Sequence, residues 1–244
     1  MTWWSSLFEG MSNAHFLNFS FLPKYLSFFT EGVVYTLMLS VIAVLLAVVP
    51  ALLLALMRLS KNKIVRSVAG AYIAVFRSTP LLVQLAIIYF GLFGVIKLPS
   101  VMIFGFIDIS RFIPGVVALA LNSAAYVAET FRAGILAVDI GQTEAARSLG
   151  LSSWQAMRLV VLPQAIKNIL PALANEVVTM VKESSICMTY GMQEIMWGAK
   201  TVAGSTLITL GPYIIAAVIY FGINYPAGKL IEAIERRMRR GDRR

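Results

Sequence analysis

Hydrophobic residues along this chain gather into long blocks, and short polar connections separate the blocks. A helix needs about 20 apolar residues to cross roughly 30 Å of hydrocarbon, where it satisfies its own backbone hydrogen bonds. The pattern therefore predicts an all-α polytopic membrane protein with five transmembrane helices. They are expected at residues 31–57, 68–96, 112–138, 168–187 and 211–231.

Basic residues at the ends of these blocks predict the orientation of the chain. The connection after the first block carries Arg58, Lys61, Lys63 and Arg66 and no acidic residue. Cytoplasmic loops carry such an excess of Lys and Arg, and the arginine-rich end of the chain belongs to the same side. We therefore expect the N-terminus outside and the C-terminus inside.

The predicted organisation is one membrane domain with two short flanks. Residues 1–30 mix aromatic residues with Ser and Asn, which is typical of an interfacial segment, here on the outer side. Residues 31–231 form the five-helix domain, and residues 232–244 form a basic cytoplasmic tail. Because five is odd and no internal repeat is visible, a pathway through the membrane would need a second copy or a close homologue.

Composition narrows the possible chemistry. The chain is 59% hydrophobic and 14% charged with a net charge of +9, and its basic residues lie beside apolar blocks, which favours membrane anchoring over nucleic-acid binding. With one cysteine, Cys187, and one histidine, His15, no metal site is expected. No nucleophile and base can be paired, so we expect a non-enzymatic chain. The stretch GAKT has Ala199 where a P-loop needs glycine.

A charged segment, residues 139–171, interrupts the apolar pattern between the third and fourth spans. Gly150 can end a first helix and the following serines can cap a second one, while Pro163 and Pro171 would kink or end it. Two interpretations stay open for this helical hairpin: it rests on the bilayer, or it is a docking surface for a cytoplasmic partner.

Polar residues inside the spans fall into stripes, each on one helix face. They can hold helices together or line a path through the membrane, and their joint occurrence on several helices favours a polar lining. The residues concerned are Arg77 and Gln84 in the second span, Asn122, Tyr126 and Glu129 in the third, and Glu176, Thr179 and Glu183 in the fourth, and Tyr213, Tyr220 and Asn224 repeat the pattern in the fifth.

Several motifs resemble one family of membrane proteins. The spacing of Glu144, Ala145, Ala146 and Gly150 before Ile169, Leu170 and Pro171 resembles the EAA coupling loop of permease subunits of ATP-binding cassette importers. The stretches FRSTPLLVQ, NSAAYVAETFRAGI, LPQAIKNILPALANE and KESSI are similar to the polar amino-acid branch of that family. The resemblance covers roughly residues 20 to 235.

The resemblance implies a type I importer permease in a bacterial cytoplasmic (inner) membrane. It would pair with a second permease subunit, identical or homologous, and receive a polar amino acid such as histidine, arginine, glutamine or cystine from an extracytoplasmic solute-binding protein. Two ATPase subunits would bind ATP and Mg, with no cofactor on this chain. They would dock on Glu144, Ala145, Ala146, Leu149, Gly150 and Leu151. Glu129, Glu176 or Glu183 could meet the substrate's ammonium group, and Arg77 or Asn122 its carboxylate.

A different class of function stays as the alternative. A secondary amino-acid transporter would use an ion gradient and no ATPase, and the odd number of spans argues against it. A membrane enzyme and a purely structural anchor fit less well, since the chain lacks a catalytic set and carries polar stripes.

Overall fold

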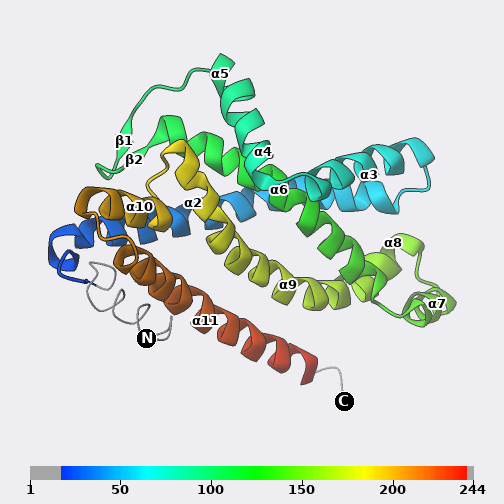
Figure 1. Ribbon diagram of the computed structural model, residues 1–244. Coiled ribbons are helices and arrows are strands. Elements are labelled where there is room, and N and C mark those ends of the chain that lie inside the picture. The colour runs from blue at the N-terminus through cyan, green and yellow to red at the C-terminus, as the bar shows by residue number, and fades with distance from the viewer. Residues whose placement is uncertain (1–17, 241–244) are drawn as a thin grey trace, which may run out of the picture.

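The computed structural model of the protein describes residues 18–240, and nearly all of them are helical (Figure 1). The mostly helical prediction is thus confirmed, apart from one small antiparallel hairpin that pairs Met102 with Asp108. In chain order the elements are α2 (Leu22–Leu59), α3 (Lys63–Ser78), α4 (Leu81–Ala86), the π-helical η2 (Ile87–Leu92), α5 (Phe93–Val95), β1 (Met102–Ile103), β2 (Ile107–Asp108), α6 (Ile109–Leu136), α7 (Ile140–Ser148), α8 (Ser153–Ala156), the π-helical η3 (Met157–Val161), α9 (Leu162–Glu183), the 3₁₀-helical η4 (Ser184–Tyr190), α10 (Ile195–Thr206) and α11 (Gly211–Arg240).

Alanines form the contact between the two most closely packed helices, α2 and α6. Ala43, Ala47, Ala51 and Ala55 recur at every fourth position of α2 and are fully buried. On the α6 side Ala118, Ala124, Ala125 and Ala128 are buried as well. Small residues at this spacing let two membrane helices approach closely without a hydrophobic driving force. The α2–α6 pair is therefore the centre on which the other helices pack.

Three helices of the described residues are long and apolar enough to cross a membrane: α2, α6 and residues 211–238 of α11. A fourth span results if α3 and the helix 81–95 are counted together, although they are bent by 106°. The helix α9 lies where the fourth span is predicted, but it is not among the helices that are long and apolar enough to cross a membrane. The count of five spans stays a prediction.

The bend lies within the predicted second span, residues 68–96, where Pro80 leads us to expect a kinked helix. Thr79 is extended, with φ −113° and ψ 144°, and Pro80 follows it. The residue before a proline is pushed out of the helical region by the proline ring, so a helix ends there. The predicted second span is therefore two helices joined at residues 79–80.

The flanking segments also differ from their predicted bounds. Of the predicted interfacial segment 1–30, residues 1–17 lie outside the described residues, and α2 begins at Leu22 with a kink at Tyr25. The helix α11 continues through the predicted tail as far as Arg240, and residues 241–244 lie outside the described part. The predicted outer connection after residue 187 contains the short helix α10.

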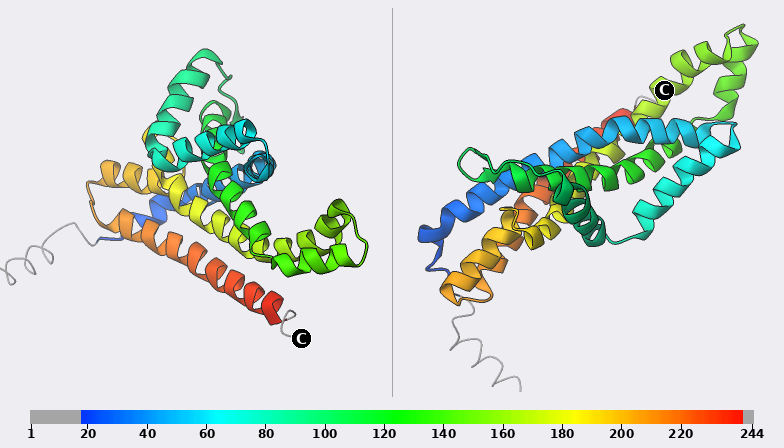
Figure 2. Two further views of the ribbon diagram at one scale, coloured as in Figure 1. Left: turned by 90° about the vertical axis from the view of Figure 1, so that its right-hand side faces the viewer. Right: turned by 90° about the horizontal axis from the view of Figure 1, so that it is seen from above.

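Different turns and short elements lie at the two ends of the helical bundle (Figures 1 and 2). The α2–α3 turn and the α7–α8 hairpin lie at one end, and the β-hairpin, α10 and the start of α2 lie at the other. The predicted cytoplasmic connections thus share one end of the molecule.

Candidate functional site

The predicted hairpin is formed by α7, a tight turn and α8. In the turn Leu151 N–H donates to Ala146 O at 3.2 Å, and Gly150 N–H donates to Arg147 O at 3.0 Å. This pair of bonds is a Schellman motif, which needs a left-handed residue after the helix. Gly150 supplies it with φ +89°. The predicted helix end at Gly150 is confirmed.

A capping box starts the second helix of the hairpin. Gln155 N–H donates to Ser152 Oγ at 3.2 Å, and Ser152 N–H donates to Gln155 Oε1 at 2.8 Å, so two otherwise unpaired backbone donors are satisfied. Arg147 Nη1 bonds Ser153 Oγ at 2.8 Å across the turn. These bonds fix the angle between the two helices.

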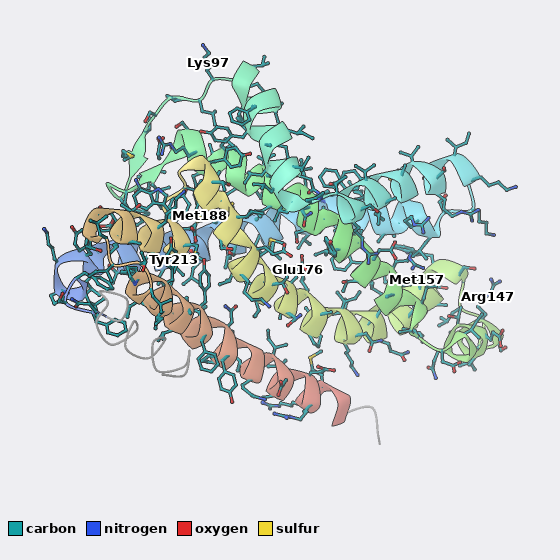
Figure 3. All side chains as sticks on the ribbon, viewed as in Figure 1. Lys97, Arg147, Met157, Glu176, Met188 and Tyr213 are labelled. Carbon is teal, nitrogen blue, oxygen red and sulfur yellow. The ribbon has the colours of Figure 1, made fainter. Side chains whose placement is uncertain are left out.

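The outer surface of the hairpin is apolar at its tip. Leu149 is 85% exposed and Trp154 is 69% exposed. Glu144, Ala145 and Gly150 are exposed too, whereas Ala146 is buried and Leu151 is half-buried. Figure 3 shows Arg147 at the far end of the molecule. Most of the predicted coupling residues therefore form an accessible, rigid surface, and the small side chain of Ala146 serves packing inside the hairpin.

A π-helical turn, η3, joins the hairpin to α9. Leu162 N–H donates to Met157 O, one residue beyond the α-helical spacing. Pro163 has no N–H to donate to the preceding turn, and the Gln164 side chain donates to Val160 O at 2.9 Å. Such π turns are frequent at functional sites. The predicted irregularity at Pro163 takes the form of a widened turn between the hairpin and the bundle.

On α4 and α6, two predicted pathway residues bind each other. Asn122 Nδ2 donates to Gln84 Oε1 at 2.8 Å, and both side chains are buried. Gln84 Nε2 lies 2.8 Å from Phe76 O and 3.0 Å from Thr79 O, carbonyls that the helix break leaves without a helical partner. Gln84 therefore closes the bend of α3 and α4 and ties it to α6.

The other predicted pathway residues of α3 and α6 are also engaged within the chain. The Arg77 guanidinium lies 5.3 Å from the centre of the Tyr126 ring. Glu129 pairs with Arg132 at 2.7 Å and with Arg58 of α2 at 3.7 Å. In this region the structure joins the polar side chains in contacts within or between helices.

The helix α9 carries the remaining predicted residues, and α11 runs beside it (Figures 1 and 3). Glu176 accepts a hydrogen bond from Ser123 Oγ of α6 at 2.8 Å. Glu183 lines a cavity of about 550 Å³, here named the Glu183 cavity. Thr179, which is half-buried, lies between these two residues on α9. The walls of the Glu183 cavity are Leu81, Lys182, Glu183, Ser185, Ile186, Met188, Thr189, Met196 and Tyr220.

A second cavity of about 510 Å³ lies nearer the hairpin, between α9 and α11, whereas the walls of the Glu183 cavity come mainly from η4 and the end of α9. It is named here the Asn175 cavity. Its polar walls come from Lys167, Asn168 and Asn175 of α9 and Glu232 and Glu235 of α11. The two cavities have volumes typical of small-molecule sites, and both contain acidic, basic and neutral polar side chains. Each cavity therefore offers both an acidic and a basic side chain.

The sequence prediction missed several polar walls of these cavities. Asn168, Asn175 and Lys182 lie on one face of α9, because seven residues turn a helix by nearly two full turns. The seven-residue spacing of these three residues is visible in the sequence and could have indicated a second polar stripe on α9. Tyr220 belongs to a predicted stripe on α11, and the cavity shows what that stripe faces.

A buried carboxylate, Glu194, holds the opposite end of the bundle together. It is fully buried at the start of α10, accepts the N–H groups of Met196 and Trp197, and receives the Tyr220 hydroxyl at 2.8 Å. Burial raises the pKa of Glu194 to about 7, although these hydrogen bonds lower it. Beside it, Ile195 N–H donates to Thr36 Oγ1 of α2. Nothing in the local sequence indicates that Glu194 is buried, and only the tertiary structure shows it.

Residues 43–240 match the family described as binding-protein-dependent transport system inner membrane component. A putative glutamine transport system permease protein of Rickettsia typhi is 41% identical over 218 residues, covering 89% of this chain and 95% of that protein. The arginine transport system permease protein ArtQ of Bacillus subtilis is 39% identical over 226 residues, covering 93% and 99%.

Solved structures show the same fold. A chain of the structure described as an amino acid ABC transporter with histidines is 47% identical, has a TM-score of 0.81, and is matched over 91% of this chain and 99% of its own. A chain of the MetNI methionine ABC transporter in an inward-facing conformation is 18% identical, with a TM-score of 0.65 over 86% and 97%. The second likeness concerns the fold alone.

Proposed function

Because the chain belongs to the family of binding-protein-dependent transport system inner membrane components, we propose that it is the permease subunit of an ATP-driven importer of a polar amino acid. Similar chains are named as glutamine and arginine permeases, and the similar solved structure is an amino acid ABC transporter with histidines. The sequence motifs and the cavities agree with a substrate of this size and charge.

The single observation that carries the proposal is the continuity from the hairpin to the cavities. The rigid α7–α8 hairpin passes through η3 directly into α9, and α9 lines both cavities. A force on the hairpin would therefore move one wall of the substrate path. In this mechanism two ATPase subunits, which bind ATP and Mg, dock on the exposed residues Glu144, Ala145, Leu149 and Gly150.

The substrate path in this proposal runs along α9 and α11, each of which lines both cavities. Glu183 would meet the substrate's ammonium group and Lys182 its carboxylate, with Tyr220 beside them. Charged hydrogen bonds of this kind are about twice as strong as neutral ones. The Asn175 cavity would receive the substrate next. Arg77, Gln84, Asn122, Tyr126 and Glu129 would instead stabilise the wall behind this path.

The topology in the proposal has five spans, the N-terminus outside and the hairpin in the cytoplasm of a bacterium. Support comes from the basic α2–α3 turn, which lies at the same end as the hairpin (Figure 2). A second permease subunit, identical or homologous, would complete the channel, and a solute-binding protein would deliver the amino acid on the outer side.

The test is ATP hydrolysis by proteoliposomes that hold the permease, its ATPase subunit and a loaded solute-binding protein. Stimulation by the loaded protein should be lost in Glu144→Lys, because the reversed charge lies on the docking surface. It should be kept in Lys97→Glu, an exposed charge reversal at the end that lacks the hairpin (Figure 3). Wild-type uptake driven by an ion gradient, without any ATPase, would replace this proposal by a secondary transporter.

A further inference from the structure

Three basic side chains at the α2–α3 turn are exposed and have no acidic neighbour in the chain. Lys61, Lys63 and Arg66 are all exposed, and no Asp or Glu occurs between Glu31 and Asp108. Among residues 18–240 the side chains of these three form no ion pair or hydrogen bond. Their charge is available to a partner outside the chain.

The fourth cation of the turn has another task. Arg58 turns inward, where its Nε lies 3.7 Å from a carboxylate oxygen of Glu129 on α6. The turn is thereby attached to the centre of the bundle. Asn62 accepts the Ile64 N–H at 2.9 Å and caps α3, which fixes Lys61 and Lys63 on either side of it. The three exposed cations therefore occupy a defined place and do not sit on a loose loop.

Exposed apolar side chains lead away from the turn on both helices. On α3, Ile64 is 75% exposed, and Val68 and Val75 are each 57% exposed. On α2, Leu53 is 57% exposed and Leu56 is 52% exposed. Because a water-soluble partner would leave these flanks in water, the surroundings of the turn match acyl chains.

The length of α2 places the turn at headgroup level. The uncharged part of α2 runs from residue 32 to residue 57, and at 1.5 Å per residue it spans about 39 Å. This exceeds the roughly 30 Å of hydrocarbon by less than the thickness of the two headgroup layers. The cations that follow Arg58 then lie among the phosphates of one leaflet.

We propose that Lys61, Lys63 and Arg66 form a binding site for the phosphate headgroups of anionic phospholipids. The apolar stripe of α3 would receive the acyl chains, and the Arg58–Glu129 pair would transmit the anchoring to α6. Juxtamembrane cations attract anionic lipid by about fivefold in affinity per residue, so the three together contribute roughly 100-fold. This site is separate from the substrate path and from the hairpin.

The experiment measures binding of fluorescent phosphatidylglycerol to the assembled transporter in phosphatidylcholine nanodiscs. Lys61→Gln/Lys63→Gln/Arg66→Gln should weaken binding about 100-fold. The matched control, Lys24→Gln/Lys97→Gln/Lys200→Gln, removes three exposed cations elsewhere and should change it by less than about twofold. Because lipid binding is read without measuring transport, a failure of this site is distinguishable from a failure of the proposed function.

A charge-preserving variant tests whether the loss of lipid binding comes from the lost charges or from misfolding. Lys61→Arg/Lys63→Arg/Arg66→Lys should bind the lipid as the wild type does. Equal losses in the control triple variant would show only general attraction to cations and would overturn the site. The site would also be overturned if lipid binding stayed unchanged while the ATPase subunit dissociated, or if inorganic phosphate competed as well as the lipid does.

Discussion

The polar residues of α3, α4 and α6 and those of α9 and α11 are spaced alike in sequence and serve different ends in space. Around α6, Gln84 binds Asn122, and Glu129 binds Arg58 and Arg132. Along α9, Glu183 and Lys182 face a cavity that Tyr220 of α11 also lines. On the same α9 stripe, however, Glu176 accepts a hydrogen bond from Ser123 of α6. Each polar residue therefore becomes a contact where another helix covers it with a matching group, and a cavity wall where none does.

The largest effect expected from this comparison is on stability. Gln84→Leu would leave Phe76 O, Thr79 O and the Asn122 amide without their partner. At about 1 to 3 kcal/mol for each polar group that loses its partner, with the lower figure for the two partly buried carbonyls, the loss should be about 4 kcal/mol. Denaturant unfolding of the purified permease measures it. The control Gln142→Leu changes an exposed glutamine and should stay within about 0.5 kcal/mol of wild type. If Gln84→Leu and Gln142→Leu reduced the free energy of unfolding equally, the hydrogen bonds of Gln84 at the helix break would have no special role in stability.

The buried Glu194 predicts a pH dependence of stability. Its folded pKa is about 7 and its ordinary value is 4.5, so the folded state binds the proton more tightly. Stability should be greatest below about pH 4.5 and should fall by about 3 kcal/mol as the pH rises through 7. Thermal unfolding across this range tests it. Glu194→Gln, which cannot titrate, should flatten the profile, and an unchanged profile would contradict the assignment.

A change to a residue that lines the Glu183 cavity is expected to affect transport rather than stability. Glu183→Gln should reduce amino-acid uptake about tenfold, because about 1.5 kcal/mol of a charged hydrogen bond is lost. The unfolding midpoint should stay near the wild-type value, since Glu183 borders a cavity. Uptake by proteoliposomes of the whole importer measures the first quantity, and thermal unfolding measures the second.

The smallest effect is expected for Glu129→Gln on α6, the change that matches Glu183→Gln on α9. Glu129→Gln removes a carboxylate whose partners are partly exposed, so it should cost about 0.5 to 1 kcal/mol of stability and leave uptake nearly unchanged. If Glu129→Gln and Glu183→Gln reduced uptake equally, the division between contact residues and path residues would be wrong.

Local chemistry made part of the molecule predictable from the sequence. The end of α7 follows from Gly150, because only a residue without Cβ adopts its φ of +89° easily, and the start of α8 follows from Ser152 and Gln155. The apolar blocks likewise located α2, α6 and α11. These features depend on neighbours a few residues apart, and such neighbours are adjacent in any fold.

The break at Pro80 is an intermediate case. The proline was visible, yet the apolar block ran through it and predicted one span. The bend of 106° is stable because Gln84 satisfies the freed carbonyls. Whether a proline kinks a helix or ends it therefore depends on the partners available to its neighbours.

Only the tertiary structure decided what each polar stripe meets. Helical periodicity shows that Asn122 and Glu129 share a face, but it does not show that Gln84 and Arg58 lie opposite them. The same limit applies to Glu194, which the sequence places in a polar connection and the fold buries under α11. The sequence by itself thus determined the long helices α2, α6 and α11, the hairpin and the composition of each helix face, but not the break at residues 79–80 or the helix α10. The packing of distant segments determined which faces are closed and which line a cavity, because that choice depends on the mutual fit of all the helices at once.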